Sequence, residues 1–228
     1  MLLSRRHSHQ SNSPNQKTRG LLLDRGWRYD LEVWFFDTFV AHGEVNRLRH
    51  RVLDLADLSA GSKLLDVGCG TGTLAIQAAR RLPEAGQVTG VEPAPRQIAR
   101  ARSKARRAGI KVDFQSGVIE KLPFPDRTFD TVTSTLMMHH LPDELRRQGL
   151  DEIIRVLKPQ GSLIVADFDY PDGHKSRTKA AANGYGGTDT LPELIQQTGF
   201  NDISIEHITF RRSHRGWTGA SVISAHKG

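Results

Sequence analysis

Glycines at alternate positions form the first candidate site in this 228-residue sequence. Gly68, Gly70 and Gly72 follow the short apolar run Lys63–Val67, and a helical pattern begins directly after them. Glycine lets the backbone approach a ligand closely, and the first turn of a helix carries unpaired N–H groups. The pattern therefore predicts a nucleotide site at the turn from a buried parallel strand into a helix.

Two carboxylates narrow the choice of ligand. Asp66 lies at the end of the first strand, just before the glycines, where it would repel a pyrophosphate and hold an ammonium group. Glu92 ends the apolar run 87–91 and is placed to accept hydrogen bonds from a ribose diol. S-adenosylmethionine fits both acids, because it has no phosphate and carries an ammonium and a sulfonium group. NAD would also use Glu92, but Thr73 stands where its fingerprint requires glycine.

Two adjacent histidines are candidate general bases. His139 and His140 follow the predicted strand 129–134, and parallel sheets bind ligands beyond the carboxyl ends of their strands. Imidazole titrates near physiological pH and could take a proton from a nucleophile. Both residues also precede a predicted helix start at Pro142, so a packing or capping role competes with catalysis. The sequence does not choose between the two histidines.

These candidates need a single α/β domain to position them, and 228 residues are long enough for one. The predicted segments are a disordered basic tail (1–20), a helical cap (21–58), a cofactor-binding core (59–168), a glycine-rich flexible loop or lid (169–189), and a C-terminal helix with a strand pair (190–228). The last four segments together form the predicted domain, 21–228.

Five segments, in this order along the chain, resemble the class I S-adenosylmethionine-dependent methyltransferases. They are LLDVGCGTG at 64–72, VTGVEP at 88–93, LPFPDRTFDTV at 122–132, HHLPD at 139–143 and RVLKPQGSLIVADF at 155–168. The resemblance is to the small-molecule branch, methyltransferase type 11, which is similar to quinone and sterol methyltransferases. It implies a Rossmann-like three-layer sandwich with a seven-stranded, mostly parallel sheet and an antiparallel C-terminal edge pair.

The resemblance also implies roles for individual residues at the cofactor. The expected contacts are Asp66 and the loop Gly68, Cys69, Gly70 and Gly72 for the methionine end, Glu92 with Pro93 for ribose, Val118 and Ile119 flanking adenine, and Ser134, Thr135 and Tyr29 for the amino acid. Cys69 is expected as a small residue between glycines rather than as a nucleophile. Val118 departs from the family pattern, since similar enzymes commonly place an aspartate there to accept from the adenine amino group. Adenine is therefore expected to be held by apolar packing and by the backbone at Val118 and Ile119.

The function implied is transfer of the S-adenosylmethionine methyl group to a small-molecule acceptor by in-line displacement, with S-adenosylhomocysteine as product and no metal. Such a reaction needs mainly alignment and exclusion of water, so a dedicated base is optional. Two alternatives stay open: an RNA methyltransferase, and a non-catalytic domain of the same fold that binds a cofactor or partner. The acceptor and the oligomeric state cannot be deduced from the sequence.

Composition bears on partners and location. The formal charge of +7 would suit nucleic acid, but much of it lies in the tail and in the predicted helix 96–107, away from the expected acceptor site. A nucleic-acid partner is therefore disfavoured. No apolar run approaches the roughly 20 residues that span a bilayer, so no transmembrane segment is expected. The single cysteine indicates a reducing compartment, and we expect a cytoplasmic protein, with organelle import through the basic tail as the alternative.

Overall fold

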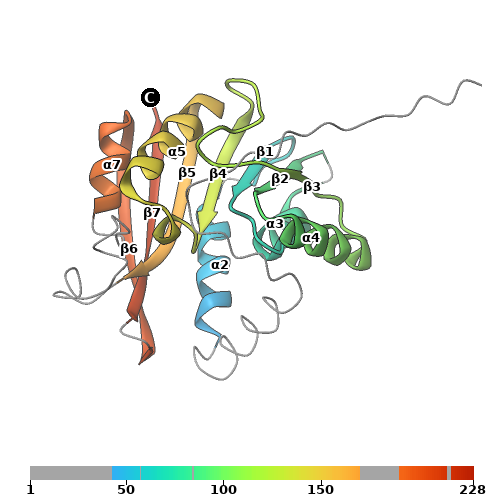
Figure 1. Cartoon of the computed structure of the whole chain (residues 1–228), viewed down its shortest axis with the longest axis horizontal. Helices are drawn as coiled ribbons and strands as arrows, with labels where there is room; N and C mark the ends of the chain where they lie inside the picture. Colours follow the sequence, from blue (N-terminus) through green and yellow to red (C-terminus); the bar gives the residue numbers. More distant parts are fainter. Residues whose placement is uncertain (1–42, 57, 84, 170–189, 215–216) are drawn as a thin grey trace, which may run out of the picture.

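The computed structural model describes residues 43–56, 58–83, 85–169, 190–214 and 217–228. These residues form a seven-stranded sheet in the order β3-β2-β1-β4-β5-β7-β6 (Figure 1). Its strands are β1 (Lys63–Val67), β2 (Gln87–Glu92), β3 (Asp113–Ser116), β4 (Phe129–Thr135), β5 (Leu157–Asp169), β6 (Phe200–His214) and β7 (Trp217–Lys227). The first five strands are parallel, and β7 runs antiparallel to both β5 and β6. The predicted fold class is confirmed.

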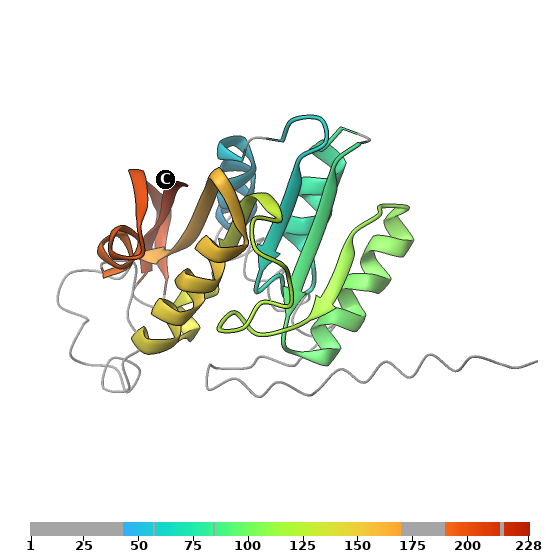
Figure 2. The same ribbon diagram turned by 90° about the horizontal axis from the view of Figure 1, so that it is seen from above.

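Helices cover both faces of this sheet. The described helical segments are α2 (Glu44–Leu55), α3 (Thr73–Arg81), α4 (Pro95–Ala108), the 3₁₀ turn η2 (Met138–His140), α5 (Asp143–Val156) and α7 (Leu191–Gln197). One apolar core contains buried residues of α2, α3 and α4, and a second contains those of α5 and α7. Figure 2 shows α2 and α5 on opposite sides of the sheet. The arrangement is therefore a three-layer sandwich.

The alternation of side chains along β1, an interior strand of the sheet, illustrates the two cores. Leu64 packs into the core with α3, and its neighbour Leu65 packs into the core with α5. Successive residues of a strand point to opposite faces of the sheet. Because helices cover both faces, both side chains are fully buried. A strand covered on both faces reads as the continuous apolar run seen in the sequence.

The parallel strands bring their carboxyl ends to one edge of the sheet. Asp66 on β1 pairs in register with Gly90 on β2 and Thr133 on β4, so the strand ends that carry the candidate residues lie side by side. Residues 1–42 and 170–189 lie outside the described residues. The expected tail, the first part of the cap and the lid therefore stay predictions, as do the proposed domain boundaries.

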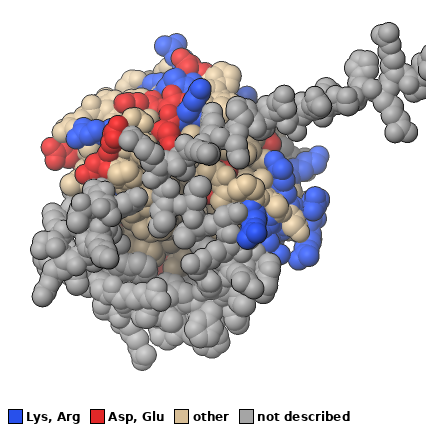
Figure 3. Space-filling view, in the orientation of Figure 1, with Lys and Arg blue, Asp and Glu red and all other residues tan. Residues whose placement is uncertain are grey.

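Charge is unevenly distributed over the surface. Helix α4 contains six Lys or Arg residues and no Asp or Glu. In Figure 3 the basic side chains gather at the edge that carries α4, whereas those toward α5 are mixed with acids. Among the described residues, no helix combines the length and apolar character needed to cross a bilayer.

Candidate active site

The glycine loop adopts the backbone that its sequence predicts. Gly68, Gly70 and Gly72 all have left-handed conformations, with φ of 70°, 54° and 74°. Residues with side chains rarely adopt this region, so glycine is strongly favoured at each position. The N–H groups of Gly68 and Cys69 donate to Val91 O at 2.9 and 3.0 Å, which fixes the loop against β2. A Cβ at Gly68 would overlap Met137, so the loop also lies close to the opposite wall.

Asp66 is a buried carboxylate with spare hydrogen-bonding capacity. Its side chain is 2% exposed, and Oδ1 accepts a hydrogen bond from Thr133 Oγ1 at 3.2 Å. Oδ2 is buried and has no hydrogen-bond partner among the described residues. Burial raises the pKa of Asp66 to about 7, and the Thr133 bond and the charge of Arg49 offset this only in part. A cation arriving at Oδ2 would complete the site.

Glu92 is held by backbone donors on both sides. Gly70 N donates to Oε2 at 3.2 Å, and Ala94 N donates to Oε1 at 3.0 Å. Each oxygen of a carboxylate can accept more than one hydrogen bond, so Glu92 can also accept from a ligand's hydroxyls. The carboxylate is therefore oriented before any ligand arrives.

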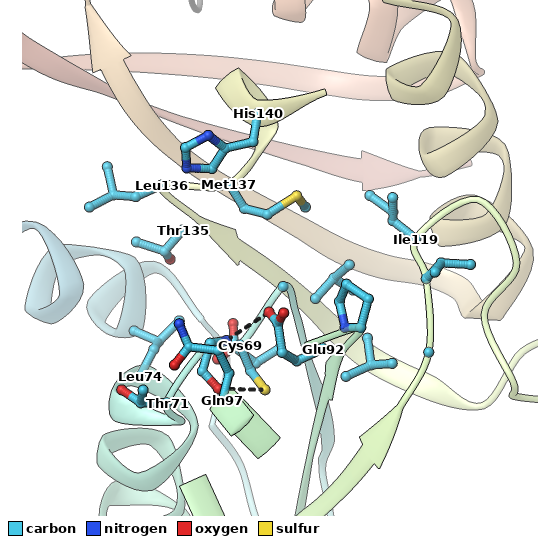
Figure 4. A pocket seen from close by; sticks show the side chains of 18 of the residues that line it. Cys69, Thr71, Leu74, Glu92, Gln97, Ile119, Thr135, Leu136, Met137 and His140 are labelled. Atoms are coloured by element: carbon cyan, nitrogen blue, oxygen red, sulfur yellow. Dashed lines mark hydrogen bonds between the residues drawn. The ribbon is translucent and has the colours of Figure 1, made fainter. Parts of the chain in front are cut away.

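A cavity at the carboxyl ends of β1, β2 and β4 collects most of the predicted residues (Figure 4). Those that line it are Asp66, Gly68, Cys69, Gly70, Glu92, Pro93, Val118, Ile119, Thr135 and His140. In Figure 4, Glu92 and Cys69 face Thr135 and His140 across the cavity. The structure thus brings together residues from the glycine loop, β2, the segment after β3, and the turn after β4.

Three predicted residues within the described part of the chain do not line the cavity. Gly72 is the N-cap of α3 and packs against Phe114 rather than lining the cavity. Ser134 is fully buried in β4, and His139 is turned toward β5. Tyr29 lies outside the described residues. The cofactor contacts expected of Gly72, Ser134 and Tyr29, and the base role expected of His139, stay predictions.

His139 is paired with a buried aspartate on the neighbouring strand. Its Nδ1 donates to Asp167 Oδ1 at 2.6 Å, and its backbone N donates to Oδ2 at 2.9 Å. Phe168 N also donates to Oδ1, at 2.8 Å. Burial tends to raise the pKa of Asp167, but the charge of His139 and these hydrogen bonds outweigh it and hold that pKa below its usual range. Asp167 therefore fixes the orientation of the imidazole and leaves Nε2 as the nitrogen that can take a proton.

His140 has the opposite environment. Its ring lies 3.9 Å from that of His139 between centroids, and it lines the cavity. Burial, together with the charge of His139, lowers the pKa of His140 to about 4. At neutral pH this side chain is uncharged, and it is a weak base.

Comparison with known proteins agrees with this geometry. Residues 64–161 match the family described as a methyltransferase domain. The chain is 34% identical over 165 residues to 27-O-demethylrifamycin SV methyltransferase of Amycolatopsis mediterranei, covering 68% of this chain and 59% of that one. It is 38% identical over 144 residues to demethylmenaquinone methyltransferase of Thermus thermophilus, covering 63% and 62%. The region that these comparisons match belongs to a methyltransferase domain family. The chain spans about three fifths of the length of these curated relatives.

One similar solved structure is of a protein named for a reaction other than methyl transfer. The crystal structure of the [4+2]-cyclase SpnF superposes with a TM-score of 0.68 at 26% identity, covering 79% of this chain and 80% of that one. Likeness to a methyltransferase fold is thus shared with a protein named for ring formation. The fold alone therefore does not define the reaction of this chain, which depends on the residues of its site.

Several residues that line the cavity were not predicted from the sequence. The additional lining residues include Arg49, Thr71, Thr73, Gln97, Glu120, Leu136 and Met137. Thr71 and Thr73 lie within the glycine loop and could have been found by extending it. Lys104 of α4 donates to both hydroxyls, at 3.1 and 2.9 Å, a contact that sequence spacing does not reveal. Arg49 carried no sequence signal beyond its type, whereas Asp167 lies near the end of the apolar run in 155–168 and could have been found as Asp66 and Glu92 were.

Leu136 has an unusual backbone for its residue type. It lines the cavity with a φ of 56°, in the region that favours glycine. Its N–H donates to Ala166 O at 2.8 Å, so the hydrogen bond to β5 holds this conformation. Strain of this kind concentrates where a chain must present side chains in a fixed position, here at the start of the histidine turn.

Proposed function

We propose that this chain transfers the methyl group of S-adenosylmethionine to a small-molecule acceptor by in-line displacement. The observation that carries the proposal is Asp66, a buried carboxylate at the glycine loop whose Oδ2 lacks a partner among the described residues. The ammonium of the cofactor's amino acid is the donor that such an oxygen requires. A phosphate-bearing cofactor would meet repulsion at the same place.

The other groups of the cavity suit the same cofactor. Arg49 brings a positive charge to the wall near Asp66 and can pair with the cofactor's carboxylate. Glu92 accepts the two ribose hydroxyls while Gly70 and Ala94 hold it in place. Thr135 Oγ1 is a further buried oxygen without a partner among the described residues. The bound cofactor would supply an activated methyl group, and the residues named here would bind and orient it.

The neutral His140 suits the positive sulfonium. A protonated imidazole in this wall would repel the cofactor, and its lowered pKa of about 4 keeps it uncharged at neutral pH. Exclusion of water by Leu136, Met137 and Leu141, which line the same wall, would strengthen the remaining electrostatic contacts.

We propose that His139, rather than His140, is the base that takes the proton from the acceptor. Asp167 holds Nδ1 of His139 protonated, so Nε2 carries the free lone pair. Nε2 would accept the proton that the acceptor's nucleophilic atom gives up, while the cofactor would supply the methyl group and leave as S-adenosylhomocysteine. Asp167 then stabilises the imidazolium that results. His139 lies outside the cavity lining of the described residues, so the acceptor would approach from the side of β5.

A second candidate function is a reaction other than methyl transfer on the same fold. The match to a protein named as a [4+2]-cyclase favours it. In that case the cofactor would bind at Asp66 and Glu92 without being consumed. An RNA acceptor is disfavoured, because the basic residues concentrate on the outer face of α4. We also propose a cytoplasmic location, supported by the free cysteine Cys69 buried in the loop.

Mass spectrometry of S-adenosylhomocysteine formation separates the two functions. The protein is incubated with S-adenosylmethionine and a panel of hydroquinones, phenols and hydroxylated macrocycles, the acceptor classes suggested by the relatives' names. Methyl transfer predicts product and S-adenosylhomocysteine in equal amounts, dependent on acceptor. Tight binding of S-adenosylmethionine without its consumption across the panel would favour the second candidate.

A further inference from the structure

The segment expected to flank adenine contributes an acid, Glu120, to the cavity lining. Val118 occupies the position where similar enzymes commonly carry aspartate, and it is an apolar residue with 4% exposure. Two residues later, Glu120 also lines the cavity. Its Oε2 is buried and has no hydrogen-bond partner among the described residues. A carboxylate oxygen withdrawn from water in this way requires a hydrogen-bond donor, which a ligand in the cavity can supply.

The backbone around Glu120 is held firmly in place. Val118 and Lys121 form an isolated antiparallel bridge, closed by the bond from Lys121 N to Val118 O at 3.2 Å. Ile119 packs so closely on α5 that a Cβ at Gly149 would lie 2.6 Å from its side chain. Leu122 N donates to Glu152 Oε2 at 2.7 Å. Glu120 is thus carried on a rigid turn, and its position does not depend on a loose loop.

Glu92 and Glu120 occupy different places along this side of the cavity. Glu92 pairs with Ser116 across β2 and β3, and its oxygens are oriented by Gly70 and Ala94. Glu120 lies beyond the end of β3, in the segment expected to flank adenine. Ribose hydroxyls therefore meet Glu92. The remaining donor of the nucleoside is the exocyclic amine of the base.

We infer that Glu120 accepts a hydrogen bond from the exocyclic amine of the cofactor's adenine and so replaces the acid missing at position 118. The inference rests on the proposed function, because it assumes that a nucleoside occupies the cavity. It makes Glu120 a specificity-determining residue. A base that carries oxygen in place of the amine would set two acceptors against each other, so the site selects adenine over hypoxanthine.

Calorimetric titration with S-adenosylhomocysteine and S-inosylhomocysteine tests the inference. The second compound differs by the replacement of the exocyclic amine with oxygen. Wild-type protein should bind the adenine compound about 10- to 100-fold more tightly, the scale of one hydrogen bond to a charged group. Glu120→Gln should reduce this preference to about threefold or less, because an amide can donate to the hypoxanthine oxygen as well as accept from the amine.

Two further variants keep the result interpretable. Glu120→Met removes all hydrogen bonding and should also lose the preference, so it replaces Glu120→Gln if that variant does not fold. Glu193→Gln changes an exposed acid on α7 and should retain the wild-type preference.

The outcomes distinguish this inference from the function beneath it. Equal affinities of wild-type protein for the two compounds would overturn the role of Glu120, as would an undiminished preference in both Glu120 variants. Either result leaves the cofactor assignment standing. Failure of folded wild-type protein to bind S-adenosylhomocysteine would overturn the proposed function and this inference with it.

Discussion

Two regions at the same edge of the sheet use a buried aspartate in opposite ways. At the glycine loop, Asp66 accepts one hydrogen bond from Thr133, and its pKa is raised to about 7. At the histidine turn, Asp167 accepts three hydrogen bonds from His139 and Phe168, and its pKa lies below the usual range. Both side chains are 2% exposed, so burial alone does not explain the difference.

The difference lies in where the compensating donors come from. Asp167 receives its donors from the chain itself, so this region is complete without a ligand. Asp66 keeps one oxygen without a partner among the described residues, so a donor from a ligand can still be added to this region. The first arrangement suits a group that orients a base, and the second suits a group that binds a cofactor.

The largest effect on the rate of methyl transfer is expected from a change at the histidine turn, where Asp167 pairs with His139. Asp167→Asn removes the charge that stabilises the His139 imidazolium and favours the wrong tautomer. Methyl transfer should slow by roughly 10² to 10⁴, the range of general-base contributions. Single-turnover kinetics with a productive acceptor measure this rate, and the affinity for S-adenosylhomocysteine should stay unchanged. Equal losses in rate and cofactor affinity would indicate that Asp167 only supports the fold.

The next effect concerns the pH dependence of stability at Asp66. Its folded pKa of about 7 exceeds the ordinary value of 3.8, so the folded state binds more protons between these values. The stability of the unliganded protein should therefore fall as pH rises from about 4 to 7, by up to about 4 kcal/mol from this group. Urea denaturation of wild type and Asp66→Asn across this range gives the measurement. Parallel curves for the two proteins would contradict the raised pKa.

Glu92 should show an intermediate effect confined to the cofactor. Glu92→Ala removes the acceptor for the ribose hydroxyls and should weaken S-adenosylhomocysteine binding by about 1.5 to 3 kcal/mol. The loop donors Gly70 and Ala94 would lose their partner too, so Glu92→Gln serves as the milder companion that retains one acceptor oxygen. Unchanged affinity in the alanine variant would exclude the ribose assignment.

The smallest effect is expected at the neighbouring histidine. His140→Gln keeps a neutral, polar side chain of similar size in the cavity wall. Because its pKa of about 4 makes His140 a poor base, turnover should change by less than about threefold. His139→Gln in the same assay should be as damaging as Asp167→Asn. A larger loss for His140 than for His139 would reverse the assignment of the base.

The same two regions explain what could be predicted from the sequence. The positions of the loop glycines Gly68 and Gly70 and of the acids Asp66 and Glu92 at the cavity were predictable, because they follow from local backbone conformation and from strand ends. The choice between His139 and His140 was not, since it depends on Asp167, which is 28 residues away along the chain. Arg49 and Glu120 were missed for a similar reason: only the packing of α2 and of the turn after β3 brings them to the cavity.

We propose that Asp66 binds the ammonium of S-adenosylmethionine or of its product. Calorimetric titration of S-adenosylhomocysteine measures this interaction. Titrations are run at pH 6 and pH 8 in buffers of different ionisation enthalpy, with wild type and Asp66→Asn. The account predicts micromolar binding by wild type, tighter at pH 8, with proton release at pH 6 as the ammonium replaces the proton on Asp66. The variant should bind much more weakly and release no proton. Equal binding by both folded proteins, or none by wild type, would contradict the account.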